Sequence, residues 1–132
     1  ECRAMWNIQL PDSYDGSALV ARLVWTSVTG LNNVTQESAA WGISGRAYAA
    51  GATLDQPLST QVITSGNLVT AYNAVHITPY VSLTLNGSPA GGNYAVINVA
   101  RKTNNDSLPR FVIGAARLIA VQLKYAVSTF GE

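Results

Sequence analysis

The chain has 132 residues, a length that suits one domain, and 48% of them are hydrophobic, which is enough to fill one core. Only 11% are charged, and the net charge of +1 provides no cationic stripe for the phosphates of a nucleic acid. The single cysteine, Cys2, excludes an internal disulfide, and no apolar run is long enough to span a membrane.

Alternating apolar and polar residues predict β-strands, with turn-forming residues between them. The expected strands cover residues 4–10, 18–26, 39–50, 61–64, 69–77, 80–85, 93–101 and 111–125. In the last run, Ile119, Val121, Leu123 and Tyr125 fall on one face. Its first half also fits a helix, although Gly114 disfavours a helix by about 1 kcal/mol relative to alanine.

About eight short strands without a long helix predict one all-β domain over residues 1–132, built as a sandwich or a barrel. The loops expected near residues 27–38 and 102–110 are long, which favours connections between two sheets over tight hairpins. We therefore expect an antiparallel two-sheet sandwich of jelly-roll type. An immunoglobulin-like sandwich is the alternative, but its Cys–Trp–Cys signature is absent. Trp6, Trp25 and Trp41 fall on the apolar faces of their strands and are expected in the core.

The third strand carries the candidate ligand face. Arg46 and Tyr48 alternate onto one side of it, and Tyr72, Tyr80 and Tyr94 could add aromatic surface. Such a set could stack on sugar rings, so a glycan-binding module is one hypothesis; the alternative is packing in the second sheet or at a subunit contact. Gly42 and Gly45 in the same strand predict a bulge or a close backbone approach.

No residue set points to catalysis. His76 is the only histidine and lies in a strand pattern, and no nucleophile-elbow motif accompanies it. Asp12 and Asp15 flank a turn, but their spacing does not match an EF-type calcium loop. The sequence therefore predicts no catalytic, metal-binding or cofactor-binding residue, and a protein that is not an enzyme.

One buried ion pair is expected. Arg101 follows the inward phase of its strand, and an unpaired buried charge is costly. The candidate partners are Asp106 and Asp55, and the pair Arg101–Asp106 is the structural ion pair that we predict.

The low charge content has two interpretations. Interfaces between subunits are depleted in lysine and glutamate, so neighbouring subunits could occupy much of the surface. Alternatively, the chain has an ordinary β surface of uncharged polar residues. We favour the first interpretation.

The order of several segments resembles a known group of proteins. The segments are Leu10-Pro-Asp-Ser-Tyr-Asp-Gly16, Ala18-Leu-Val-Ala-Arg-Leu-Val-Trp25, Trp41-Gly-Ile-Ser-Gly-Arg-Ala-Tyr48, Asn98-Val-Ala-Arg101 and Ala116-Arg-Leu-Ile-Ala-Val-Gln-Leu-Lys-Tyr125. From about Trp6 to Tyr125, the chain is similar to small β-sandwich proteins that tailed bacteriophages encode among their structural genes.

The resemblance implies a component of the virion: a head decoration or cement protein, or a fibre domain, usually a homotrimer. Its partner would be the major capsid protein or another virion protein, and neither nucleic acid nor a membrane is expected. In such a trimer, the outward sheet face with Val20, Arg22 and Val24 is the candidate subunit contact. A glycan- or receptor-binding module of a phage fibre is the alternative function.

Overall fold

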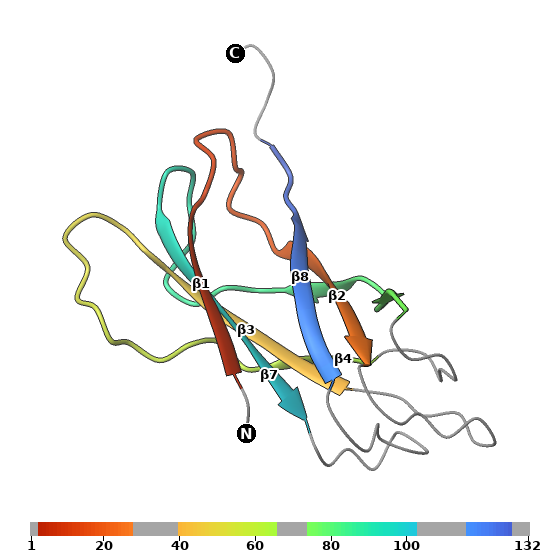
Figure 1. Cartoon of the computed structure of the whole chain (residues 1–132). Coiled ribbons are helices and arrows are strands. Elements are labelled where there is room, and N and C mark those ends of the chain that lie inside the picture. The colour runs from red at the N-terminus through yellow and green to blue at the C-terminus, as the bar shows by residue number, and fades with distance from the viewer. Residues whose placement is uncertain (1–2, 28–39, 66–73, 103–115, 128–132) are drawn as a thin grey trace.

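A computed structural model describes residues 3–27, 40–65, 74–102 and 116–127, and these residues form eight β-strands and no helix (Figure 1). The strands are β1 (Arg3–Gln9), β2 (Leu19–Ser27), β3 (Ala40–Tyr48), β4 (Val62–Ser65), β5 (His76–Ile77), β6 (Val81–Leu83), β7 (Tyr94–Lys102) and β8 (Ala116–Lys124). Residues 116–120 are therefore strand and not helix. Residues 69–73 and 111–115 of two predicted strands lie outside the described residues, and residues 74 and 75 precede β5 without being part of it.

The strands form two antiparallel sheets, which confirms the predicted all-β sandwich. Sheet 1 has the order β1-β7-β3-β4. In sheet 2, β2 is central: β8 pairs along one edge, and β5 and β6 pair in succession along the other. β2 and β3 lie in different sheets, as do β7 and β8, so the long connections after β2 and β7 join the sheets as predicted.

One segment is shared between the two sheets. Val81–Leu83 pairs with β2 in sheet 2, whereas Asn86 bridges to Arg46 in β3 of sheet 1. The amide of Ala47 donates to the carbonyl of Asn86 at 2.9 Å, and the amide of Asn86 donates to the carbonyl of Gly45 at 3.2 Å. This shared strand closes one side of the sandwich.

Bare glycine backbone lets the shared strand approach β3. A Cβ at Gly45 would lie 2.6 Å from Cδ2 of Leu85 and 2.8 Å from the carbonyl oxygen of Val96. A Cβ at Gly87, where φ is +88°, would lie 2.2 Å from the carbonyl oxygen of Ala47. The close backbone approach predicted at Gly45 is thus confirmed.

The centre of the outer face of sheet 1 is buried. Ser44 and Asn98 point outward, yet each is only 2% exposed. The side chain of Gln61 lies over Gly42, where a Cβ would be 2.8 Å from its Oε1, so at this glycine a side chain makes the close approach and not a backbone segment. Lys102 Nζ donates to the same oxygen at 2.7 Å.

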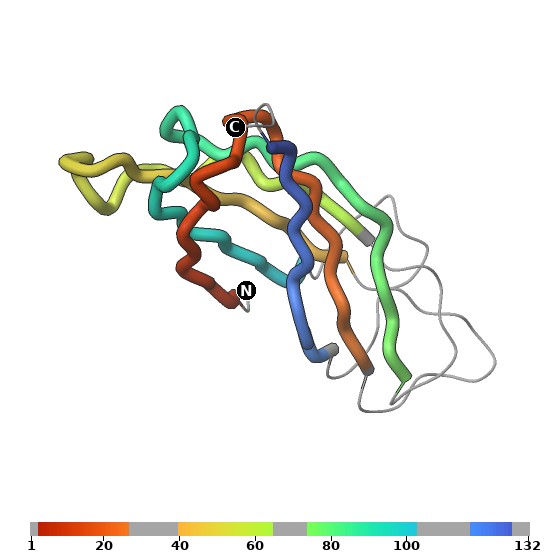
Figure 2. The backbone as a smooth tube through the Cα atoms, turned by 90° about the horizontal axis from the view of Figure 1, so that it is seen from above, coloured from red at the N-terminus to blue at the C-terminus, as the bar shows by residue number. Residues whose placement is uncertain are grey.

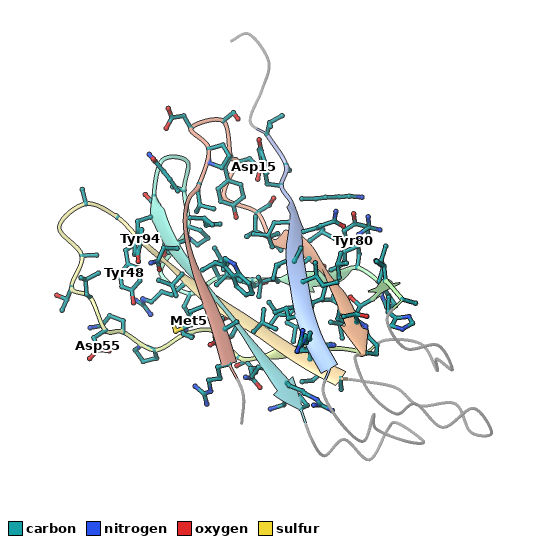
Figure 3. All side chains as sticks on the ribbon, in the orientation of Figure 1. Met5, Asp15, Tyr48, Asp55, Tyr80 and Tyr94 are labelled. Carbon is teal, nitrogen blue, oxygen red and sulfur yellow. The ribbon has the colours of Figure 1, made fainter. Side chains whose placement is uncertain are left out.

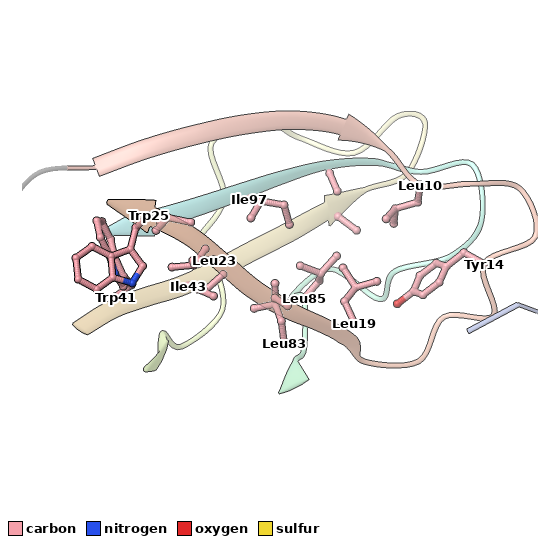
Figure 4. Close-up of a cluster of buried hydrophobic side chains, with 14 residues drawn as sticks. Leu10, Tyr14, Leu19, Leu23, Trp25, Trp41, Ile43, Leu83, Leu85 and Ile97 are labelled. Carbon is pink, nitrogen blue, oxygen red and sulfur yellow. The ribbon is translucent and has the colours of Figure 1, made fainter. Parts of the chain in front are cut away.

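The core fills the space between the sheets. Figure 4 shows it running from Trp25 and Trp41, whose ring centroids are 6.3 Å apart, to Leu10 and Tyr14 at the other end. Trp25 is fully buried and Trp41 is 4% exposed, as predicted. Trp6 is only half-buried, because it packs against the core from the open side of the sandwich.

A β-bulge changes the phase of β8. Val24 pairs with Ala120 and Trp25 pairs with Leu118, so Ile119 is the additional residue. Leu118 therefore points inward, and the side chain of Ile119 is 53% exposed. The prediction that Ile119 lies on the same face as Val121 and Leu123 is wrong, because those two pack against the core.

We expect Gly45→Ala to lower the free energy of unfolding by about 2 kcal/mol, because the added methyl group overpacks the space that Leu85 fills. Urea denaturation measures this change. The comparison variant is Gly51→Ala, whose Cβ would meet nothing within 4 Å. It should lower the free energy of unfolding by about 1 kcal/mol, because alanine is disfavoured in the left-handed backbone conformation at this position (φ +86°). Equal urea midpoints for Gly45→Ala and the unchanged chain would contradict the close approach.

Candidate functional site

Two open hollows lie on the outer side of sheet 1, beside the connection that follows β3. Figures 1 and 2 show this connection swinging away from the sandwich before it returns. The hollows have volumes of about 370 and 330 Å³, within the usual range for ligand sites, and they share Tyr48, Leu54 and Tyr94 as lining residues. We call them together the tyrosine cleft. Its further lining residues are Met5, Ala49, Ala50, Ala52, Asp55, Gln56, Leu58, Gly92, Asn93 and Val96.

The register between β3 and β7 brings the two tyrosines together. Tyr48 pairs with Tyr94, and their ring centroids are 5.9 Å apart with the planes tilted by 38°. The hydroxyl of Tyr94 donates to Oδ1 of Asn7 at 2.8 Å, and the amide of Gln56 donates to the hydroxyl of Tyr48 at 3.4 Å. Both rings are therefore held at their hydroxyl ends. Figure 3 shows Tyr48, Tyr94, Asp55 and Met5 in the same region of the molecule.

The predicted ligand-face residues Arg46 and Tyr48 have different roles in this cleft. Tyr48 lines both hollows, but it is only 8% exposed. The guanidinium of Arg46 lies 5.7 Å from the centre of the Tyr48 ring and donates through Nη1 to the carbonyl of Pro57 at 2.9 Å. Nδ2 of Asn86 donates to the same carbonyl at 3.3 Å. Arg46 thus fixes the connection and does not line the hollows.

A second feature lies on the open side of the sandwich. Among the described strands, β1 pairs only with β7 and β8 pairs only with β2, so each keeps one free edge. Between the two edges is an apolar groove of about 90 Å³. We call it the β1–β8 seam, and it is lined by Trp6, Ile8, Ile97, Val121 and Leu123.

Tyr14 closes one end of the seam. It bridges to Val127, its ring packs edge-on against Tyr125 at 6.5 Å, and its hydroxyl donates to the carbonyl of Ser17. Burial raises the pKa of the Tyr14 phenol, and the neighbouring charge of Asp15 raises it further. Hydrogen bonds from the hydroxyl and the amide of Ser17 lower the pKa of the Asp15 carboxyl.

The candidate subunit contact lies on the outer face of sheet 2. Val20, Arg22 and Val24 are all half-buried. Nε of Arg22 donates to Oε1 of Gln122, and its guanidinium lies 4.6 Å from the centre of the Tyr80 ring. The three residues lie on one face of the sheet, and the contacts with Gln122 and Tyr80 hold the side chain of Arg22. Their role in a subunit contact stays a prediction.

The structure tests only half of the expected ion pair. Arg101 pairs with the inward-pointing Trp41 at the end of β7, and this register gives it the inward phase of the strand. Asp106 lies outside the described residues, so the pair itself stays a prediction. Asp55 lines a hollow on the outer side of sheet 1, whereas Arg101 follows the inward phase of β7, which argues against Asp55 as the partner.

The remaining polar candidates have structural surroundings. His76 lies in β5 as predicted, with its ring 4.8 Å from that of Trp25. Asp12 and Asp15 lie in the turn between β1 and β2, and no group of three or more histidine, cysteine, aspartate or glutamate residues gathers within the described ranges. No helix of the described residues is long and apolar enough to cross a membrane.

Sequence reasoning missed most of the tyrosine cleft. It identified Tyr48 and Tyr94, but it did not identify Met5, Leu54 or Asp55. Met5 and Leu54 are 60% and 65% exposed, and large apolar side chains at such exposure often mark binding surfaces. The sequence feature that could have indicated these cleft residues is the neighbouring apolar and acidic pair Leu54-Asp55 in an expected loop. The pair gave no indication of which strand it would face.

Comparison with known proteins adds no relative. No protein-family model, no curated protein and no solved structure matches the chain.

We expect the Tyr14 phenol to ionise above the usual pKa of a tyrosine, because burial favours its neutral form. Its contribution to stability is present below the pKa of an unfolded tyrosine and is lost as the pH rises through the higher folded-state pKa. Ultraviolet absorbance titration of the folded chain measures this. Tyr14→Phe should remove the late component, whereas Tyr125→Phe should retain it. A single common transition for all tyrosines of the folded chain would show that this expectation is wrong.

Proposed function

We propose that the chain is a structural component of a virus particle and acts by binding neighbouring protein subunits without catalysis. The observation that carries the proposal is the β1–β8 seam, where two strand edges flank an apolar groove lined by half-buried residues at the border of the core. The sequence resemblance to structural proteins of tailed bacteriophages and the low charge content agree with it.

The seam has the physical features of a site for strand addition. Each edge strand has one side that no described strand pairs with, and an edge of this kind can offer main-chain amide and carbonyl groups to a further strand. The two strands run in the same direction in Figure 1, so an incoming strand of opposite direction would be antiparallel to both. Main-chain hydrogen bonds would give affinity, and the groove would select the side chains.

The occupant that fits is an extended segment of a neighbouring subunit with apolar side chains at alternate positions. Trp6, Ile8, Val121 and Leu123 line the groove and are each half-buried, so an apolar side chain placed there completes their burial. Burial of apolar surface contributes about 25 cal/mol per Å² before the cost of association. A charged side chain in the same place would lose its hydration without gaining a partner.

A second surface can serve the same assembly. On the outer face of sheet 2, Val20 and Val24 are half-buried and Ile77 is 47% exposed, beside the ordered guanidinium of Arg22. An apolar surface with one fixed cation is typical of the centre of a protein interface. This face is the contact that we propose for a homotrimer, with the major capsid protein or another virion protein as the further partner.

We expect Val121→Lys to weaken binding to the particle about tenfold or more, because it places an ammonium group in the apolar groove. The matched control is Ile119→Lys on the same strand, which should bind normally because Ile119 is 53% exposed and lies outside the groove. Binding is measured by sedimenting tagged chain with purified particles that lack it. Thermal unfolding monitors the fold of each variant, and Val121→Thr is a milder second variant.

Hydrogen exchange tests the location of the contact. Free-edge amides of β1 and β8 should exchange fast in the isolated chain and slowly in the particle, because only the neighbour pairs with them. Slow exchange in an isolated monomer would contradict the proposal, as would absence of the chain from purified particles of the virus that encodes it. Equal particle binding of the Val121→Lys and Ile119→Lys variants would exclude the seam as the contact.

A further inference from the structure

We propose that the tyrosine cleft binds a neutral oligosaccharide. This inference is independent of the proposed assembly function, because the cleft lies on the outer side of sheet 1 and the seam opens between the sheets. A structural subunit that presented such a cleft to solvent would also attach the particle to a glycan.

The floor of the cleft is an aromatic platform with apolar flanks. The side chain of Tyr94 is 40% exposed, with Leu54 and Met5 as exposed apolar neighbours in the lining. Sugar rings present C–H groups on their faces, and these pack well on the electron-rich face of an aromatic ring. The hydrogen bond from Tyr94 to Asn7 and the contact with Tyr48 hold the ring in place, so little conformational entropy is lost on binding.

Planar polar side chains surround this platform. Asp55 and Gln56 line the hollow on one side of Tyr94, and Asn93 lines the hollow on the other side; their side chains carry one carboxylate and two carboxamide groups. Carboxylate and amide groups offer closely spaced oxygen and nitrogen atoms that can bond adjacent hydroxyls. Asp55 has a φ of +67°, a conformation that is uncommon outside glycine and costly to maintain, and such strain is concentrated at binding sites.

The charge of the cleft selects a neutral ligand. Asp55 is the only charged side chain among the described residues that line the two hollows. The nearby cation, Arg46, donates to Pro57 and lies beside the Tyr48 ring, outside the lining. A sialic acid, uronic acid or sulfated sugar would bring a second negative charge next to Asp55, which disfavours binding.

The shape of the cleft selects more than one sugar unit. The hollows lie on the two sides of a shared boundary formed by Tyr48, Leu54 and Tyr94. A linear oligosaccharide that crosses the exposed ring of Tyr94 fills both hollows, whereas a monosaccharide fills only one. Oligosaccharides should therefore bind more tightly than their monosaccharides. A proline-rich peptide is the other ligand that aromatic grooves accept. However, proline residues have no N–H group that could donate a hydrogen bond to the carboxylate of Asp55.

The test uses the full chain on an array of neutral, sialylated and sulfated glycans, followed by calorimetry with the neutral oligosaccharides that bind. We expect Tyr94→Ala to weaken binding about tenfold, because the stacking surface is lost. Tyr94→Phe should stay within about threefold, because it keeps the ring and loses only the bond to Asn7. The matched control is Tyr125→Ala, an exposed tyrosine outside the cleft, and its affinity should be unchanged.

Two further measurements sharpen the test. Asp55→Asn should reduce the discrimination against sialylated glycans, and unchanged discrimination would contradict the role of the carboxylate. A proline-rich peptide of about ten residues is the competing probe. The proposal is overturned by an array without neutral-glycan binding, by equal affinity of Tyr94→Ala and the unchanged chain, or by Tyr94-dependent binding of the peptide alone.

Discussion

The strand shared between the sheets is the constraint on which the rest of the structure depends. Its first part, Val81–Leu83, belongs to sheet 2. Further along the segment, the backbone of Asn86 forms hydrogen bonds with the backbone of β3 in sheet 1. The crossing is possible only because Gly45 leaves room for Leu85. The same Asn86 holds the carbonyl of Pro57, so the crossing also positions the connection that forms the tyrosine cleft.

The shared strand closes only one side of the sandwich. On the other side, β1 and β8 each keep one edge that no other described strand pairs with. Natural edge strands are usually protected by inward-pointing charges, prolines or bulges. Here the cations of the two edge strands, Arg3, Arg117 and Lys124, do not line the seam, and Lys124 lies 4.0 Å from the centre of the Tyr80 ring. The bulge at Ile119 interrupts the regular pairing near the beginning of β8 and leaves the rest of this edge regular. The seam thus combines apolar side chains with two edges that no described strand pairs with, and such a combination favours a partner strand over solvent.

The strands were predictable because their pattern is local. Alternation in β1 identifies Trp6 and Ile8 as inward-facing, and the glycine at position 45 signals a close approach that the structure confirms. Pairing between distant strands was not predictable, since the contact of Tyr48 with Tyr94 depends on the register of β3 with β7. The bulge at Ile119 carries no glycine or proline signal, so periodicity alone gave the wrong face.

Strand β1 belongs to both proposed surfaces, because successive side chains of a strand point to opposite faces. Trp6 and Ile8 line the seam, whereas Met5 lines the cleft and Asn7 accepts the hydrogen bond of Tyr94. A backbone change in β1 would therefore disturb both surfaces together. Side chains on other strands separate them: Val121 belongs to the seam alone and Tyr94 to the cleft alone. Assembly and glycan binding are thus separable functions of one sandwich, joined through a single edge strand.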